Sequence, residues 1–141
     1  MSKVIGFLVI IALTACTDDA VDPVGRYTLT FRWGSGSCDI TGTTDGDYQV
    51  ADFGSVFQIS DNDDPSAACN GSITCDASRC DIVFTQTSEG IADDGTAFAL
   101  TIRHNWVLND SHQVDGSGSV AVRNQVGQTC NQQFTMDGVV R

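Results

Sequence analysis

Two histidines are the residues of this chain best suited to moving a proton or orienting a ligand. His104 follows Ile102 and precedes Trp106 in an alternating stretch, which places it on the apolar side of a predicted strand. A histidine in that position is either a neutral imidazole hydrogen-bonded inside the core or a polar group that lines a cavity and orients a ligand. His112 falls in a predicted turn, so the pattern does not require the two imidazoles to meet.

Other groups that could carry catalysis are scarce. The chain has one lysine, Lys3, so an ordinary triad or phosphate clamp would lack parts. Gly34–Ser37 and Gly116–Ser119 alternate glycine and serine, as turns and flexible strands do, and neither forms a nucleophile elbow or a phosphate loop. We therefore expect a protein that is not an enzyme, with no catalytic residues and no cofactor.

An acidic run, Asp61-Asn62-Asp63-Asp64, resembles the start of an EF-hand calcium loop. That pattern requires glycine at its sixth position and glutamate at its twelfth, where this chain has Ser66 and Ser72. We expect a solvated acidic loop from Asp61 to Ala68 and no metal site.

The N-terminus carries a targeting pattern. Lys3 precedes an apolar run from Val4 to Leu13, which as a helix would cover only about half of a hydrocarbon core and so fits a signal peptide. Leu13-Thr14-Ala15-Cys16 resembles the lipobox of bacterial lipoproteins. The resemblance implies that residues 1–15 are removed and that Cys16 is acylated, with a palmitate among its chains, to anchor the protein in a membrane.

The lipobox resemblance also bears on location. It implies a lipid-anchored protein of the cell envelope, held by Cys16 and an acidic tether up to Val24 that we expect to be disordered. In Gram-negative bacteria an aspartate directly after the lipidated cysteine usually retains a lipoprotein at the inner membrane. Here that position is Thr17, which favours the outer membrane if the host is Gram-negative.

The mature chain would be strongly acidic. Without Lys3 it has six arginines against eighteen acidic residues, a net charge of −12. All the acidic residues but Glu89 are aspartates, which favour turns and loops over helices. This charge argues against nucleic-acid binding, because phosphates need a basic patch, but it permits attraction to a basic protein.

Strand patterns fill the region from residue 25 to 141. Arg26 to Trp33 and Ala97 to Leu108 alternate apolar and polar side chains, and we expect a hairpin around Asp45-Gly46. Ser55 to Ser60 is a further predicted strand, with Phe57 and Ile59 facing inward. The sequence predicts one all-β domain of about eight strands, an antiparallel up-and-down meander, with a barrel favoured over a two-sheet sandwich. Gly25-Arg26-Tyr27 is loosely similar to the Gly-x-Trp opening of lipocalins.

Five cysteines follow Cys16, and a secreted chain should form disulfides. A four-residue loop places Cys75 opposite Cys80, and Ile73 opposite Ile82 in the same register. Early and late strands meet in a closed barrel, so Cys38 with Cys130 is the second expected pair, which leaves Cys69 free. Cys38 with Cys69 is the alternative to that second pair.

Two functions remain open. The first is an anchored barrel that binds a small apolar ligand, with Phe31, Trp33, His104 and Trp106 near the cavity. The second is a protein-interaction or inhibitor module whose acidic surface meets a basic partner. A bulky, fully packed interior would favour the second function.

Overall fold

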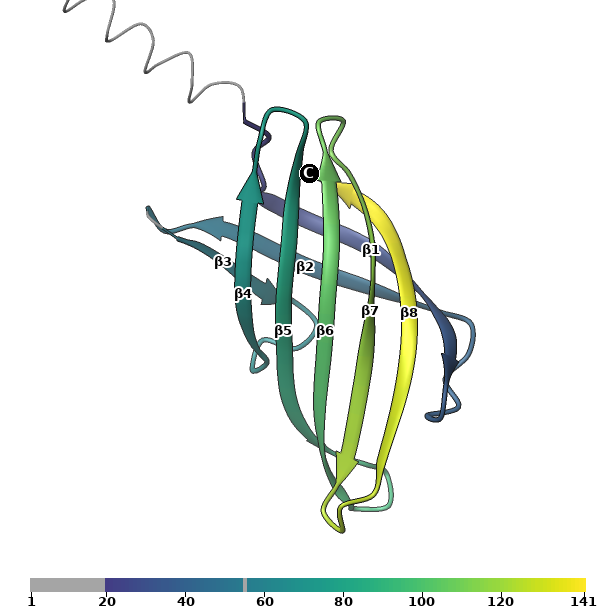
Figure 1. Ribbon diagram of the computed structural model, residues 1–141. Coiled ribbons are helices and arrows are strands. Elements are labelled where there is room, and N and C mark those ends of the chain that lie inside the picture. Colours follow the sequence, from purple (N-terminus) through teal and green to yellow (C-terminus); the bar gives the residue numbers. More distant parts are fainter. Residues whose placement is uncertain (1–19, 55) are drawn as a thin grey trace, which may run out of the picture.

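The computed structural model describes residues 20–54 and 56–141 (Figure 1). The predicted signal peptide, the lipobox-like motif and Cys16 lie outside the described residues. Within the described ranges, no helix is long and apolar enough to cross a membrane. The domain is built from strands, which are β1 (Gly25–Gly36), β2 (Thr43–Asp52), β3 (Phe57–Asp61), β4 (Ala68–Cys75), β5 (Arg79–Ile91), β6 (Ala97–Asn109), β7 (Gln113–Asn124) and β8 (Thr129–Val140).

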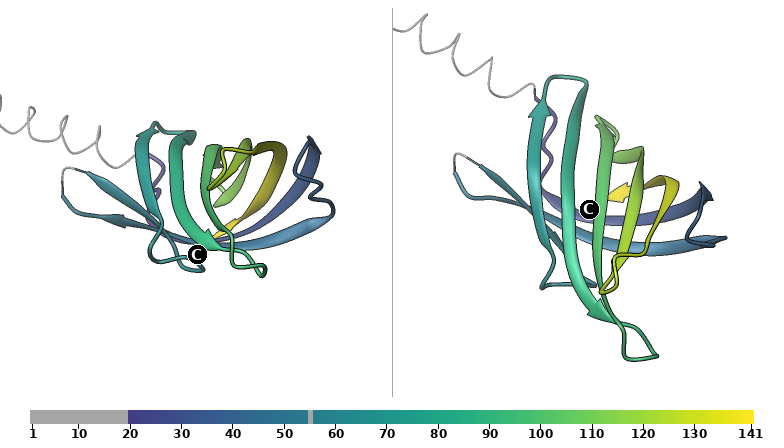
Figure 2. Two further views of the ribbon diagram at one scale, coloured as in Figure 1. Left: turned by 90° about the horizontal axis from the view of Figure 1, so that it is seen from below. Right: turned by 60° about the horizontal axis from the view of Figure 1, so that its bottom comes forward.

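The eight strands form one antiparallel sheet in the order β3-β2-β1-β8-β7-β6-β5-β4. Because β1 pairs with both β2 and β8, the first and last strands lie side by side. Figure 1 shows β1, β2 and β3 crossing behind β4 to β8, and the view from below in Figure 2 shows the sheet curling round on itself. The sheet is therefore a nearly closed barrel with its two free edges at β3 and β4, and the predicted meander is confirmed.

Alternation along each strand separates the interior of the barrel from its surface. In β1, Tyr27, Leu29 and Phe31 are buried, while Arg26 and Arg32 are exposed. Every second residue is likewise buried from Cys80 to Gln86 in β5 and from His104 to Leu108 in β6. The buried apolar residues form one core, which consists of Tyr27, Leu29, Phe31, Tyr48, Val50, Ile59, Cys80, Ile82, Phe84, Trp106, Leu108, Val114, Val120, Phe134, Met136 and Val140.

The first hairpin differs from its prediction. Residues 37–42 connect β1 to β2, and Asp45-Gly46 lies inside β2, where Gly46 pairs with Leu29. Gly46 is needed for a close approach and not for a turn, because a Cβ there would lie 2.5 Å from Cε2 of Phe31. An Asp-Gly pair is a strong turn signal, but here tertiary contact decides its place.

The third strand also differs. β3 begins at Phe57, whose side chain is exposed, and runs on to Asp61, which is buried together with Ile59. The acidic loop therefore begins after Asp61, one residue later than predicted. The Asp61 side chain belongs to β3 and points into the barrel. This shift places a charged group in the interior.

The two disulfides are the expected ones. Cys38 is joined to Cys130, with 5.0 Å between their Cα atoms, and Cys75 is joined to Cys80. The predicted register holds, with Cys75 opposite Cys80 and Ile73 opposite Ile82. Cys38 lies in the connection between β1 and β2 and not in a strand.

The segment before β1 is attached to the end of the barrel from Val21 onward. The Val21 amide donates a hydrogen bond to the carbonyl oxygen of Asp76 at 2.8 Å. The Tyr27 hydroxyl donates to the carbonyl oxygen of Pro23 at 2.7 Å. These contacts differ from the predicted disordered tether, because they hold Val21 against the β4–β5 turn and Pro23 against β1.

Candidate functional site

A row of inward-facing aromatic side chains crosses the barrel. In the sheet register Phe84 of β5 lies opposite His104 of β6, and Phe134 of β8 lies opposite Trp33 of β1. The position between them, on β7, is Gly118, where a Cβ would lie 2.4 Å from Cζ of Phe134. The glycine leaves room for the Phe134 ring, so the row is continuous across five strands.

His104 is held in this row by a hydrogen bond. Its Nε2 lies 3.0 Å from Oε1 of Gln86, and only 2% of the residue is exposed. The Tyr48 hydroxyl donates to the same Gln86 oxygen at 2.7 Å. The amide nitrogen of Gln86 donates to Oδ2 of Asp61 at 2.7 Å. Four side chains from β2, β3, β5 and β6 therefore form one buried polar network.

The network fixes the tautomer of His104. A carboxylate only accepts hydrogen bonds, so the NH₂ group of Gln86 faces Asp61 and its oxygen faces Tyr48 and His104. That amide oxygen can only accept, so Nε2 of His104 carries the proton. Nδ1 is then a bare acceptor, and it is buried without a partner among the described residues.

Burial governs the protonation of the network. Desolvation lowers the pKa of His104 to about 3, so the imidazole is neutral at physiological pH. Burial also raises the pKa of Tyr48 far above its ordinary value, and the negative charge of Asp61 adds to the shift. His104 therefore carries no positive charge that would balance Asp61.

A cavity of about 200 Å³ adjoins this network. Its inner wall is formed by aromatic and aliphatic side chains and by the His104 ring, and its other boundary by residues of β2 and of the loop after β3. The residues that line it are Phe31, Trp33, Thr44, Asp45, Gly46, Tyr48, Asp61, Asp63, Ile102, His104, Val120 and Phe134.

Three carboxylates border the cavity, and none of them belongs to an ion pair of the described chain. Asp61 is 9% exposed, and its oxygens accept from Gln86 and from the backbone amide of Asp63 at 2.9 Å. Asp45 and Asp63 are exposed. The ion pairs present involve other acids, namely Asp47, Asp81 and Asp137.

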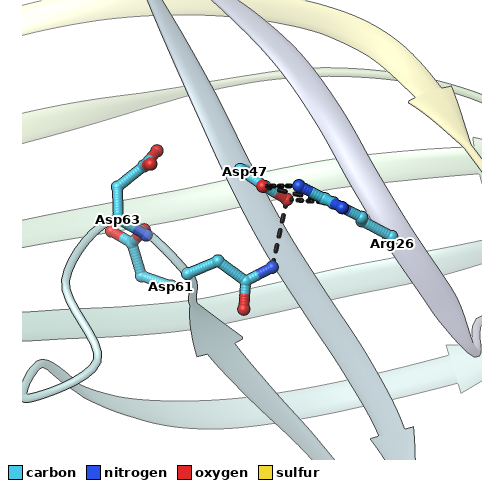
Figure 3. Close-up of polar contacts among 5 residues, drawn as sticks. Arg26, Asp47, Asp61 and Asp63 are labelled. Atoms are coloured by element: carbon cyan, nitrogen blue, oxygen red, sulfur yellow. Dashed lines mark hydrogen bonds and ion pairs between the residues drawn. The ribbon is translucent and has the colours of Figure 1, made fainter.

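Arg26, whose charge reaches Asp63 at the border, is already paired with another carboxylate. Figure 3 shows the Arg26 side chain against the carboxylate of Asp47, with Asp61 and Asp63 lying apart from it. Nε of Arg26 donates to Oδ1 of Asp47 at 2.9 Å, and this pair holds the pKa of Asp47 below its usual range. Asn62 donates a further hydrogen bond to Asp47 at 3.0 Å.

Three of the four predicted lining residues, Phe31, Trp33 and His104, border the cavity. Trp106 does not, which corrects the prediction. It is fully buried beside His104, and its ring packs against Tyr27, with 5.7 Å between the centroids. Two residues further along β6 the interior is therefore filled with side chains, and the cavity does not extend there.

Tyr48, Asp61 and Gln86 were not predicted as residues of the site. Each lies two residues from a buried apolar residue of its own strand and therefore faces the same side of the sheet. The pairs are Tyr48 with Val50, Asp61 with Ile59, and Gln86 with Phe84. The polar character of Asp61 and Gln86 concealed the alternation. In residues 20–54 and 56–141, no three histidine, cysteine or acidic side chains are grouped so that they could hold a metal ion.

Comparisons with protein-family models, with curated proteins and with solved structures find no match for this chain.

Proposed function

We propose that this protein is a membrane-anchored, extracytoplasmic binding protein whose barrel holds a small apolar ligand. The observation that carries the proposal is the cavity beside His104. Its aromatic and aliphatic wall and its few, fixed polar groups are the usual features of a small-molecule site. A core built only for stability would be packed to a density that leaves few such voids.

The size of the cavity limits the ligand. Sites for drug-sized molecules measure about 300–1,000 Å³, whereas an engineered apolar cavity of about 150 Å³ takes up benzene. At about 200 Å³ the cavity suits a body of roughly one ring. A long acyl chain would need the space that Trp106 and Tyr27 fill.

The lipobox resemblance supplies the location. A lipid on Cys16 would place the barrel at the surface of a cell-envelope membrane, the outer one in a Gram-negative host. Binding is favoured over catalysis because the sole hydrogen-bond partner of His104 among the described residues is an amide. A general base needs the reacting proton within hydrogen-bond reach, and the free nitrogen of His104, Nδ1, is fully buried.

Calorimetric titration tests the proposal. The full chain, held in lipid nanodiscs, is titrated with neutral and charged single-ring compounds, and empty nanodiscs give the blank. Ile102→Phe fills the cavity from a half-buried position, whereas Val139→Phe adds the same ring on the exposed face of β8. We expect saturable binding that Ile102→Phe abolishes and Val139→Phe keeps. Equal binding by both variants, or none by the parent protein, would contradict the proposal.

A protein-interaction role is the second candidate. Phe53 and Val56, in the connection between β2 and β3, are 63% and 61% exposed. An exposed apolar pair on a chain of high negative charge favours contact with a basic, partly apolar partner. Such binding would weaken in salt and be lost in Phe53→Ser, whereas small-ligand binding would be unchanged in that variant.

A further inference from the structure

We propose that the ligand of the cavity is an organic cation: an ammonium or similar group carried on an apolar body of about one ring. This inference rests on the proposed function and specifies the chemistry of its ligand. Three independent features of the lining support it, namely charge, hydrogen-bonding capacity and aromatic faces.

The charge around the cavity is negative, and its carboxylates belong to no ion pair of the described chain, although the charge of Arg26, which is paired with Asp47, also reaches Asp63. Asp61 is nine-tenths buried, and no basic group of the described chain pairs with it. A buried charge without a countercharge is costly, even where hydrogen bonds satisfy its oxygens. Asp45 and Asp63 add two more carboxylates at the border. A bound cation would supply the missing positive charge.

The cavity offers a ligand hydrogen-bond acceptors. The two aromatic side chains of its lining that could donate, Tyr48 and Trp33, already donate to other protein groups. The Tyr48 hydroxyl donates to Gln86, and Nε1 of Trp33 donates to Oγ1 of Thr44 at 2.8 Å. What remains at the border are the oxygens of the three carboxylates, whereas Nδ1 of His104, which has no partner among the described residues, is fully buried. A ligand that donates hydrogen bonds matches this set, whereas an anionic ligand would meet acceptors and negative charge.

Aromatic rings complete the lining. Phe31 lies edge-on to Phe134, with 5.2 Å between centroids, and Trp33 lies edge-on to Phe134 at 5.7 Å. Tyr48 and His104 form the neighbouring wall, with 5.6 Å between their rings. Ring faces attract cations within about 6 Å, and several rings around one site are a usual way to bind alkylammonium groups.

The same lining excludes a bare metal ion. No three ligating side chains come together in the described part of the chain, and aromatic and aliphatic groups cover the inner wall. Divalent cations such as calcium need six or more oxygen ligands. An organic cation keeps its apolar body against the rings and its charged group toward the carboxylates.

Three compounds that each carry one phenyl ring separate the possibilities: 2-phenylethylammonium, 2-phenylethanol and 3-phenylpropionate. Each is titrated calorimetrically into the full chain in phosphatidylcholine nanodiscs. We expect the ammonium compound to bind about tenfold more tightly than the alcohol, and the propionate not to bind. Raising the salt from about 0.02 to about 0.5 M should weaken ammonium binding and leave alcohol binding unchanged.

Substitutions locate the charge. Asp63→Asn removes an exposed carboxylate at the cavity border and should weaken ammonium binding several-fold without changing alcohol binding. Asp110→Asn makes the same change in the exposed β6–β7 turn and should change neither. Near-UV circular dichroism confirms that both variants keep the fold.

The outcomes are distinguishable. Equal or tighter binding of the alcohol, lost in Ile102→Phe, would keep the proposed function and overturn the organic cation. Ammonium binding that survives Ile102→Phe and falls equally in Asp63→Asn and Asp110→Asn would be attraction to the acidic surface, and would also overturn it. No binding of any compound would contradict both proposals.

Discussion

The imidazole of His104 lies flat on the ring of Phe84, with 4.2 Å between the ring centroids and 13° between the planes. The two residues are direct partners across β5 and β6, so strand pairing itself brings the rings together. Phe134, Trp106 and Phe31 surround the same imidazole. This enclosure removes water from His104 and keeps it neutral.

Stability should therefore depend on pH through His104. The unfolded chain takes up a proton near pH 6.5, whereas in the folded chain the lowered pKa, about 3, delays that uptake. Below about pH 6.5 the unfolded chain therefore binds more protons than the folded chain. The free energy of unfolding should be highest above that pH and fall by about 1.4 kcal/mol per pH unit as pH falls toward 3. Urea unfolding at several pH values between about 4 and 7 measures this slope.

Two variants test whether His104 causes this dependence of the free energy of unfolding on pH: His104→Gln, and His112→Asn as its control. His104→Gln should flatten the slope, whereas His112→Asn should keep it. His112 is exposed with a φ of 62°, a conformation that asparagine tolerates. Asp47, Asp76 and Asp94 have lowered pKa values, so their stabilisation is lost only as pH falls below about 5, and the slope between about pH 5 and 6.5 is free of them. A slope unchanged in His104→Gln would show that another group titrates.

Gln86 should be the most sensitive member of the polar network. Gln86→Leu leaves the Tyr48 hydroxyl and Nε2 of His104 without an acceptor and removes a donor from Asp61. We expect a loss of about 3 kcal/mol or more in the free energy of unfolding. Gln58→Leu, the same change at an exposed position of β3, should stay within about 0.5 kcal/mol. Similar losses in both variants would refute a special role for the network.

The two disulfides should contribute unequally. Cys38–Cys130 joins residues 92 positions apart, and Cys75–Cys80 joins residues 5 apart. Loop entropy predicts a loss of about 4–5 kcal/mol for the double alanine variant of the first pair and about 2 kcal/mol for that of the second. Thermal unfolding under oxidising conditions compares them. A greater loss for the short loop would contradict the entropic account.

Cys69, the free cysteine of the described residues, should be a slow thiol. Burial raises its pKa to about 11, with Asp61 and Asp64 adding to the shift, so little thiolate exists at pH 8. Labelling with iodoacetamide should be about a hundredfold slower in the native protein than in urea. A native rate close to the urea rate would show an exposed, ordinary thiol.

Regular alternation made most of the fold predictable. The inward faces of β1 and β6, the register of Cys75 with Cys80, and the meeting of early and late strands all follow from local pattern and from closure of the sheet. Gly46 was misplaced because a turn and a close approach both require glycine. Only the Phe31 ring, which comes from another strand, shows which reason applies.

The site was predictable only in part. Phe31, Trp33 and His104 share apolar faces with their neighbours, so their inward position follows from the sequence. Asp61 and Gln86 face inward as polar residues, and their burial depends on each other, because Gln86 donates to Asp61 across strands that are far apart in the sequence. Whether the interior leaves a void also depends on how all the rings pack together, which no single strand determines.

Native mass spectrometry of the protein, isolated from bacteria that express the full chain, tests the central claim most directly. We predict a small organic adduct on the parent protein that disappears on denaturation and is absent from Ile102→Phe. An adduct-free mass for the parent protein, or an adduct of equal occupancy in Ile102→Phe, would contradict a ligand held in the cavity beside His104.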